Sequence, residues 1–157
     1  MEAAIAAHGR VFDFGPVFRA EKSKTRRHLT EFWMMDAEMS FIDLKDNLDI
    51  QEELIRFMVQ AVLDNNQDDL QILERDTKPL ANITKPFYRI THEEAVKKLQ
   101  DMGSKIKDND DLGAEDETKL TQEYDNPVFV THYPAEIKAF YMKRDASGSK
   151  AECADLL

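Results

Sequence analysis

The sequence has a single cysteine, Cys153, which excludes a disulfide within one chain. It has no apolar run near the roughly 20 residues that a membrane-spanning helix needs. The first four residues carry an acid where a secretory signal would be positively charged. Positive charge is also scarce, since the formal net charge is −10. Because affinity for a phosphate backbone depends on accumulated Lys and Arg, this balance argues against general nucleic-acid binding. These absences predict a soluble cytoplasmic protein without a membrane segment.

Within this acidic chain, residues 19–28 are basic and include five Lys or Arg residues and one His. The runs on either side, 11–18 and 32–41, are rich in aromatic, β-branched and bulky residues, which favours two strands joined as an open hairpin. Arg19 and Glu21 lie two residues apart and therefore point to one face of the sheet. Such a pair can hold a guanidinium ready for phosphate oxygens. An ordinary ion pair on a solvated sheet face is the alternative.

Taken together, residues 18–32 resemble motif 2 of the class II aminoacyl-tRNA synthetases, which reads Phe-Arg-x-Glu, a variable basic loop, and then Arg/His-x-x-x-Phe. The Arg-His-Leu-Thr-Glu-Phe-Trp-Met form is more similar to the asparaginyl enzymes of that class than to the aspartyl or lysyl ones. The resemblance covers nearly the whole chain and is least distinctive at about 64–86. It continues at residues 110–118, 127–134, 138–142 and 153–157.

The resemblance implies an α+β fold, an antiparallel sheet with flanking helices that forms part of the class II catalytic fold. A chain of 157 residues, 33% of them charged, can bury one core. Motif 1, motif 3 and the anticodon-binding OB domain of the family are absent from residues 1–157. We therefore expect an internal piece of a catalytic domain, from a truncated or broken reading frame rather than a stand-alone relative. The parent protein would be a homodimer, and this piece would self-associate through a different surface.

The implied activity is the ATP-dependent conversion of asparagine to its adenylate, followed by transfer to the acceptor end of tRNA(Asn), with Mg²⁺ as the metal cofactor. Arg19 would be the catalytic residue, because it would bridge the α-phosphate and the substrate carboxylate. The residues that the resemblance assigns to ATP binding are Arg19, Glu21, Arg27, His28, Leu29 and Phe32.

Besides the ATP contacts, the resemblance implies residues that bind the amino acid, the tRNA and the metal ion. Arg19 and Glu117 would bind the amino acid. The tRNA-binding residues would be Lys22, Lys24 and Arg26, for which a solvated turn is the alternative. Asp155 would hold Mg²⁺, and a plain salt bridge is the alternative there, because a carboxylate between apolar neighbours needs a partner.

Two other functions stay open at this point. The chain could be a binding module that keeps the hairpin for nucleotide or tRNA without catalysis. It could also belong to a paralogous enzyme that adenylates aspartate, similar to an aspartyl-tRNA synthetase or an asparagine synthetase. Since motif 3 would supply the arginine that clamps the γ-phosphate, we expect residues 1–157 alone to be inactive or very weak.

Local patterns predict the remaining helices. Residues 1–8 are Ala-rich and stop at Gly9, the residue type expected just past a helix end. An apolar stripe broken by one acid predicts a helix over about 45–66 that packs on the core. The Thr91-to-Glu94 spacing is that of a capping box, so a helix should run to Met102, with His92 exposed in its first turn.

In the last third of the chain, composition predicts a solvated loop and a short helix within 104–126. A buried strand is expected at 128–131, a short helix opened by proline at 134–137 and a strand at 140–143. Turn residues at 145–148 should then lead into a strand that carries Asp155.

Overall fold

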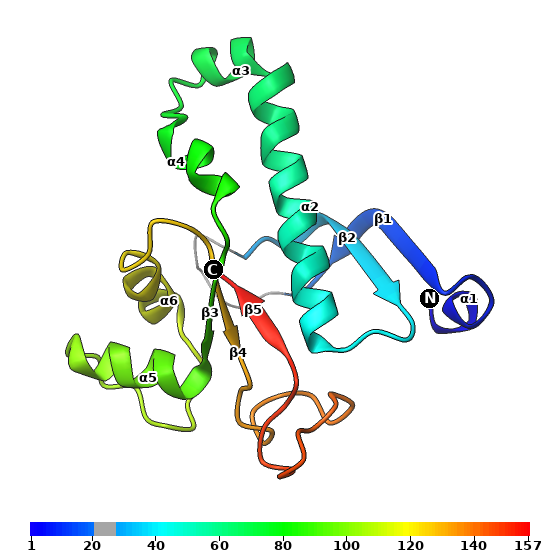
Figure 1. Cartoon of the computed structure of the whole chain (residues 1–157), viewed down its shortest axis with the longest axis vertical. Coiled ribbons are helices and arrows are strands. Elements are labelled where there is room, and N and C mark those ends of the chain that lie inside the picture. The colour runs from blue at the N-terminus through cyan, green and yellow to red at the C-terminus, as the bar shows by residue number, and fades with distance from the viewer. Residues whose placement is uncertain (21–27) are drawn as a thin grey trace. The chain divides into compact units, whose positions relative to one another are not determined.

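The computed structural model describes residues 1–20 and 28–157. These fall into two compact units, Met1–Asp43 and Leu44–Leu157 (Figure 1). The helices and strands of each unit follow largely from the local sequence patterns. None of the helices in the described ranges has the length and apolar character that crossing a bilayer requires.

The first unit is a short helix followed by a β-hairpin. Helix α1 (Glu2–His8) ends at Gly9, whose φ of 70° is a left-handed conformation that glycine adopts without steric cost. Strands β1 (Arg10–Phe18) and β2 (Glu31–Met39) pair antiparallel along their full length. The Ser40 backbone N–H and hydroxyl both donate to the Gly9 carbonyl, at 2.9 and 3.0 Å, which closes the open end of the hairpin. The predicted hairpin is confirmed.

The second unit has a three-stranded sheet with helices on both sides (Figure 1). Strands β3 (Tyr88–Thr91) and β4 (Val128–Thr131) are parallel, whereas β4 and β5 (Ala154–Leu156) are antiparallel. The helices are α2 (Leu44–Asn65), α3 (Gln67–Ile72), α4 (Lys78–Ala81), the 3₁₀ turn η1 (Asn82–Thr84), α5 (His92–Asp101) and α6 (Ala114–Thr121).

The centre of this unit is β4, whose four residues are all buried. Since strand side chains alternate between faces, Phe129 and Val130 enter different clusters. Phe129 packs with Leu48 of α2 and with residues near η1, and Val130 packs with Leu99 of α5 and with α6. The arrangement confirms the predicted α+β class, with helices flanking the sheet.

The predicted capping box is also confirmed, because the Thr91 hydroxyl accepts from the Glu94 N–H and the Glu94 carboxylate accepts from the Thr91 N–H. The prediction that His92 is exposed was wrong, since its side chain is 0% exposed. The His92 ring lies 4.8 Å from the ring of Tyr133, centroid to centroid. A capping motif predicts where a helix starts, but the face that meets the core depends on segments far along the chain.

Residues 134–137 do not form the predicted helix. Pro134 instead makes an antiparallel bridge with Lys150, and the Ala135 N–H donates to the Ser149 carbonyl at 2.9 Å. The Ile137 N–H donates to the Pro134 carbonyl at 3.2 Å, so the segment makes a single turn beside this hairpin-like connection and no helix follows.

Residues 140–143 do not form the predicted strand. The side chains of Phe140 and Tyr141 are 92% and 75% exposed, so neither ring packs on the sheet. Partial pairing lies just beyond, where Arg144 bridges Ala151. Strand propensity mostly reflects packing on a half-buried surface, and these two aromatic side chains have no such packing.

Candidate active site

At the end of β1, Arg19 and Phe32 come together across the hairpin. Val17 lies opposite Phe32 in the strand register, and Arg19 is two residues beyond Val17, so all three side chains share one face. The Arg19 N–H donates to the Thr30 carbonyl at 2.9 Å, which extends the pairing past the strand ends. The Arg19 guanidinium carbon lies 5.4 Å from the centre of the Phe32 ring. A guanidinium placed over a ring can present the N–H donors at its edge to an anionic ligand.

Two more of the candidate ATP-binding residues are described. His28 and Leu29 are both exposed and lie just before β2. The other predictions on the hairpin loop concern residues outside the described ranges: Glu21, Lys22, Lys24, Arg26 and Arg27.

In the second unit, Asp155 belongs to a group of charged residues around Lys138. The Lys138 ammonium lies 3.3 Å from the Asp155 carboxylate and 3.3 Å from the Asp111 carboxylate. It also stands over the Tyr133 ring, 3.8 Å from the centroid. The Lys138 side chain is only 14% exposed. The salt bridge that the sequence left as the alternative for Asp155 is therefore present.

Burial and charge act in opposite directions on this group. Burial by itself would lower the pKa of Lys138, but the charges of Asp155 and Asp111 outweigh it, and the net pKa is raised. Burial raises the pKa of Tyr133 far above its ordinary value, and the charge of Asp155 acts in the same direction. At neutral pH Lys138 is therefore an ammonium and Tyr133 a neutral phenol.

The donor chemistry of Asp155 is compatible with Mg²⁺, which usually takes one or two protein carboxylates and completes its shell with water and phosphate oxygens. Within the described ranges, no cluster of three or more His, Cys, Asp or Glu side chains could hold a metal by itself. A metal at Asp155 would thus depend on phosphate oxygens, and the Lys138 ammonium would have to shift toward Asp111. Asp111 provides a carboxylate at the same distance.

The remaining candidate, Glu117, lies in α6 and is partly buried. Its backbone N–H donates to the Gly113 carbonyl at 2.9 Å in the first turn of that helix. Sequence reasoning missed Lys138 and Tyr133 as members of the Asp155 group. Both residues lie within segments that resemble the family. No sequence motif relates them to Asp155, however, since Lys138 is 17 residues before it in the chain.

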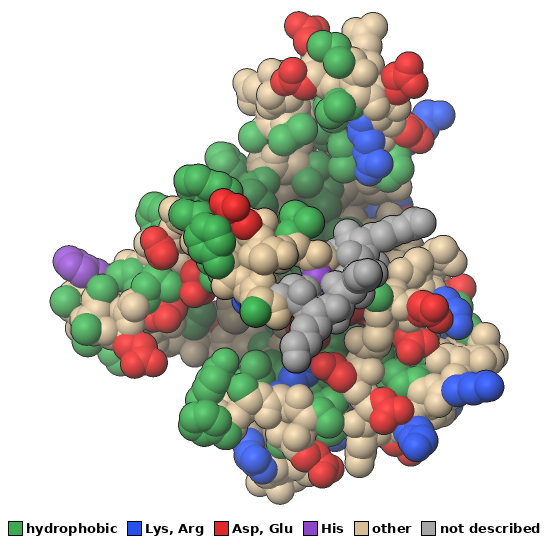
Figure 2. All heavy atoms as spheres, turned by 180° about the vertical axis from the view of Figure 1, so that it is seen from behind, with side chains coloured by type: hydrophobic (Ala, Val, Ile, Leu, Met, Phe, Trp, Pro, Cys, Tyr) green, Lys and Arg blue, Asp and Glu red, His purple; other side chains and the backbone are tan. Residues whose placement is uncertain are grey.

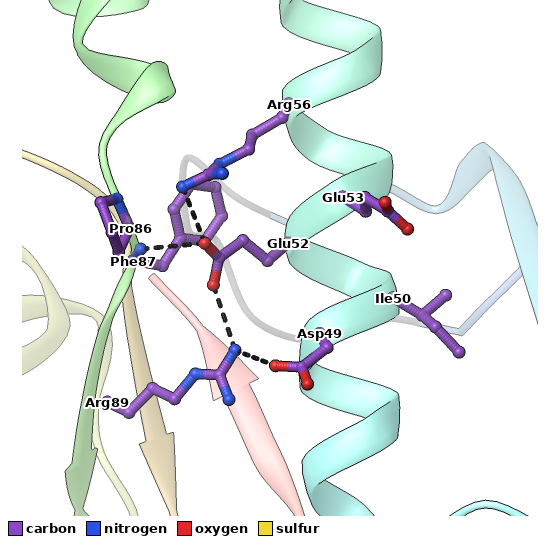
Figure 3. Close-up of a pocket in the computed structure, with 8 residues that line it drawn as sticks. All are labelled: Asp49, Ile50, Glu52, Glu53, Arg56, Pro86, Phe87 and Arg89. Carbon is purple, nitrogen blue, oxygen red and sulfur yellow. Dashed lines mark hydrogen bonds and ion pairs between the residues drawn. The ribbon is translucent and has the colours of Figure 1, made fainter.

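A pocket of about 460 Å³ lies between α2 and the start of β3 (Figure 3). Its centre is Glu52, the one acid in the apolar stripe of α2. The Glu52 carboxylate accepts from the Phe87 N–H at 3.3 Å and from Arg89 at 3.1 Å, and it pairs with Arg56 at 2.8 Å. Asp49 takes a further contact from Arg89 at 2.6 Å. Arg56 and Arg89 both pair with carboxylates of α2. We therefore interpret this network as a structural contact between α2 and the sheet, and we propose no ligand for the pocket.

The burial of His92 makes a pH-dependent stability expected. Burial lowers the pKa of His92, and the nearby Lys150 and Lys138 charges act in the same direction, against the Asp110 carbonyl and the Asp111 charge. The unfolded chain therefore takes up a proton below about pH 6.5 before the folded chain does. We expect the free energy of unfolding to fall as the pH drops from 7 toward 5.5, by at most ~1.4 kcal/mol per pH unit. Urea titrations at several pH values measure this slope.

His92→Gln, which keeps a donor for the Asp110 carbonyl, should remove the slope while lowering stability at pH 7. His8→Gln, at an exposed position of α1, should leave the slope intact. An unchanged slope in His92→Gln would assign the pH dependence to other groups.

Comparison of the chain with known proteins identifies one family. The family model described as tRNA synthetases class II (D, K and N) covers residues 2–157. The asparagine–tRNA ligase of Pelotomaculum thermopropionicum is 51% identical over 144 residues, which are 92% of this chain and 34% of that protein.

Solved structures that are similar to this chain come from the same family. Asparaginyl-tRNA synthetase from Pyrococcus horikoshii, complexed with asparaginyl-adenylate, matches 99% of this chain with a TM-score of 0.95 and 44% identity. Aspartyl-tRNA synthetase from Entamoeba histolytica matches 98% of the chain with a TM-score of 0.83 and 30% identity. The chain covers 36% and 33% of those two structures, so it spans about a third of the length of its relatives.

The chain has part of the catalytic fold of the class II aminoacyl-tRNA synthetases. More narrowly, the chain belongs to the family of class II tRNA synthetases for aspartate, lysine and asparagine.

Proposed function

We propose that this chain is part of the catalytic domain of an asparagine–tRNA ligase and supplies part of the site where ATP activates asparagine. The observation that carries the proposal is the Arg19–Phe32 pair at the base of a basic loop. It occurs in a chain that is 51% identical to an asparagine–tRNA ligase over 144 residues.

The reaction needs no protein nucleophile. The asparagine carboxylate attacks the α-phosphorus of ATP, the bond from that phosphorus to the bridging oxygen breaks, and pyrophosphate leaves. Because the attacking and leaving groups are both anionic, the protein must neutralise charge and align them. Arg19 would contact the α-phosphate and the substrate carboxylate, and Phe32 would supply the face on which adenine stacks.

The other proposed ATP contacts divide between the two ends of the nucleotide. Glu21 would meet the adenine edge, while Arg27 and His28 would meet the outer phosphates. Leu29 would complete the wall of the nucleotide site.

Three further contacts complete the proposal. Glu117 would contact the amino acid, and the loop residues Lys22, Lys24 and Arg26 would face the acceptor end of tRNA. Asp155 would hold Mg²⁺, which when bound supplies positive charge at the ATP phosphates.

Asparagine is proposed over aspartate because the likeness to asparaginyl enzymes is the stronger one. Identity is 51% to the Pelotomaculum thermopropionicum asparagine–tRNA ligase and 44% to the Pyrococcus horikoshii asparaginyl structure. The asparaginyl and aspartyl structures from Entamoeba histolytica are 32% and 30% identical to this chain. The fold alone does not separate the two amino acids, since both TM-scores exceed 0.8.

The test is a chimera, because the chain covers only 34% of the Pelotomaculum thermopropionicum ligase. The matching segment of that ligase is replaced by this chain, and amino-acid-dependent ATP–pyrophosphate exchange is measured. We expect exchange with asparagine and none above background with aspartate. Exchange that depends on aspartate would overturn the choice of substrate.

The unmodified ligase is the positive control, and the isolated chain is expected to show no exchange. A folded chimera that binds ATP but exchanges with neither amino acid would favour a nucleotide-binding module.

A further inference from the structure

The Lys138 ammonium has three neighbours, all in the second unit. It donates to Asp111 Oδ1 and to Asp155 Oδ2, each at 3.3 Å, and it lies 3.8 Å from the centre of the Tyr133 ring. An ammonium has three N–H donors, so these neighbours account for its bonding capacity. The Lys138 side chain is only 14% exposed. One nearly buried cation is therefore shared by two acidic side chains.

The two acidic side chains are held in place by the backbone, and the lysine is the movable partner. Asp155 lies within β5. The Asp111 carboxylate accepts from the Leu112 N–H at 3.1 Å, through the same oxygen that accepts from the lysine. The loop of Asp111 is also tied to α5, because the His92 ring donates to the Asp110 carbonyl at 2.9 Å. The lysine side chain has a flexible four-carbon stem and can turn between the two acids.

A metal ion at Asp155 would compete with Lys138. An ammonium and a divalent cation repel each other strongly when both lie against one carboxylate. A buried ammonium that lost its only ionic partner would be costly in turn. Asp111 removes this difficulty, because it accepts from the same ammonium at the same distance. Lys138 can therefore leave Asp155 without losing its ion pair.

We infer that Lys138 neutralises Asp155 while the metal is absent, and that Asp111 holds the ammonium once Mg²⁺ is bound with ATP. Lys138 is then a positioning residue, because it acts on the metal through Asp155 and touches no reacting atom. Its exchange between two acids sets the affinity of Asp155 for the metal. This inference rests on the proposed function, which places Mg²⁺ at Asp155.

The first experiment measures metal binding in the chimera without turnover. The probe is Mn²⁺, which like Mg²⁺ prefers octahedral oxygen ligands, added with α,β-methylene ATP, whose α–β linkage cannot release pyrophosphate. Electron paramagnetic resonance of free Mn²⁺ gives the dissociation constant. Asp155→Asn should raise this constant by at least ~10-fold, the smaller cost of losing even an outer partner of a metal site. An unchanged constant would overturn the inference.

Single variants of the two partners should change the Mn²⁺ dissociation constant in opposite directions. Lys138→Met removes the competing cation and should lower it roughly three- to tenfold, the weight of one partly buried ion pair. Asp111→Asn removes the alternative partner and should raise it by a similar factor. Lys138→Gln should act as Lys138→Met does, and it carries the test if the methionine variant does not fold. A shift in the same direction for both partners would overturn the inference.

Lys85→Met is the matched control, since Lys85 belongs to the same unit and pairs with Asp125 instead. It should leave the Mn²⁺ dissociation constant within about twofold of the original chimera. A shift as large as that of Lys138→Met would make the effect one of total charge and would overturn the inference. Circular dichroism checks that each variant is folded.

The double variant separates exchange between partners from a simple effect of charge. Removing a nearby positive or negative charge would by itself shift metal affinity in the directions given above. If Asp111 acts only by holding Lys138, however, Asp111→Asn should change the dissociation constant by less than about twofold when Lys138→Met is already present. Single effects that add in the double variant would overturn the inference.

The exchange assay supplies the second readout. The Mg²⁺ concentration for half-maximal exchange should shift as the Mn²⁺ constant does, while the rate at saturating Mg²⁺ stays within about twofold. A lower maximal rate with unchanged half-saturation would assign Lys138 a structural role and overturn the inference. Failure of the proposed function is distinguishable, because it appears as a lack of asparagine-dependent exchange in the original chimera. The Mn²⁺ titration requires no amino acid.

Discussion

Replacing Arg19 by alanine in the chimera is expected to reduce asparagine-dependent ATP–pyrophosphate exchange by roughly 10²–10³-fold, the usual cost of removing one preorganised group from a developing charge. Arg19 is the described cation at the base of the hairpin, and its guanidinium carbon lies 5.4 Å from the centre of the Phe32 ring. Removing it would leave the negative charges of the carboxylate and the α-phosphate without this partner as they approach each other.

Arg19→Lys should recover only part of the rate, because an ammonium keeps the charge but not the planar fork that binds two oxygens at once. Arg10→Ala is the matched control. It removes the same charge from the same hairpin, nine residues away in the sequence, which is ~30 Å along an extended strand. Its exchange rate should stay within about threefold of the chimera. An Arg19→Ala chimera that keeps more than a tenth of the rate would remove Arg19 from the proposed catalytic role.

Replacing Tyr133 by alanine is expected to lower the free energy of unfolding of the second unit by about 3–5 kcal/mol, the range for removing a large buried ring. Tyr133 is 0% exposed and packs in the cluster that holds Leu99 and Val130. Its ring also contacts His92 and Lys138. Since small domains have only ~5–15 kcal/mol of stability in total, we expect this variant to be largely unfolded in mild denaturant.

Tyr133→Phe separates the ring from its hydroxyl. The hydroxyl is buried and has no hydrogen-bond partner within the described ranges. Phenylalanine keeps the stacking and should change stability by less than about 1 kcal/mol. Urea unfolding followed by circular dichroism measures both variants at one low protein concentration. Equal losses in the two variants would show that the hydroxyl, rather than the ring, holds the cluster.

Much of the fold follows from local signals. The hairpin follows from two runs rich in aromatic and bulky residues on either side of a polar loop, and α5 follows from the Thr91–Glu94 capping box. Helix α2 follows from its apolar stripe. In each case the groups that satisfy the backbone lie within the element or in the adjacent strand, so short-range patterns carry the information.

The errors have one common cause. His92 is buried because Tyr133, 41 residues later, packs on it. Residues 134–137 are not helical because their backbone pairs with 149–150, and 140–143 are not a strand because their rings stay in solvent. Each outcome depends on which distant segment supplies the packing, and local propensity carries no information about that.

The sequence by itself determined the class of the protein and predicted where a nucleotide site would lie. The Phe-Arg-x-Glu string and its basic loop point to Arg19 and Phe32, and strand alternation puts them on one face of a hairpin. Only the tertiary structure decided that Asp155 pairs with Lys138, that Asp111 shares this cation, and that Tyr133 lies beneath it. It also showed that His92 is buried against Tyr133. Charge and alternation are properties of the chain order, whereas partners and exposure depend on contacts between segments far apart in it.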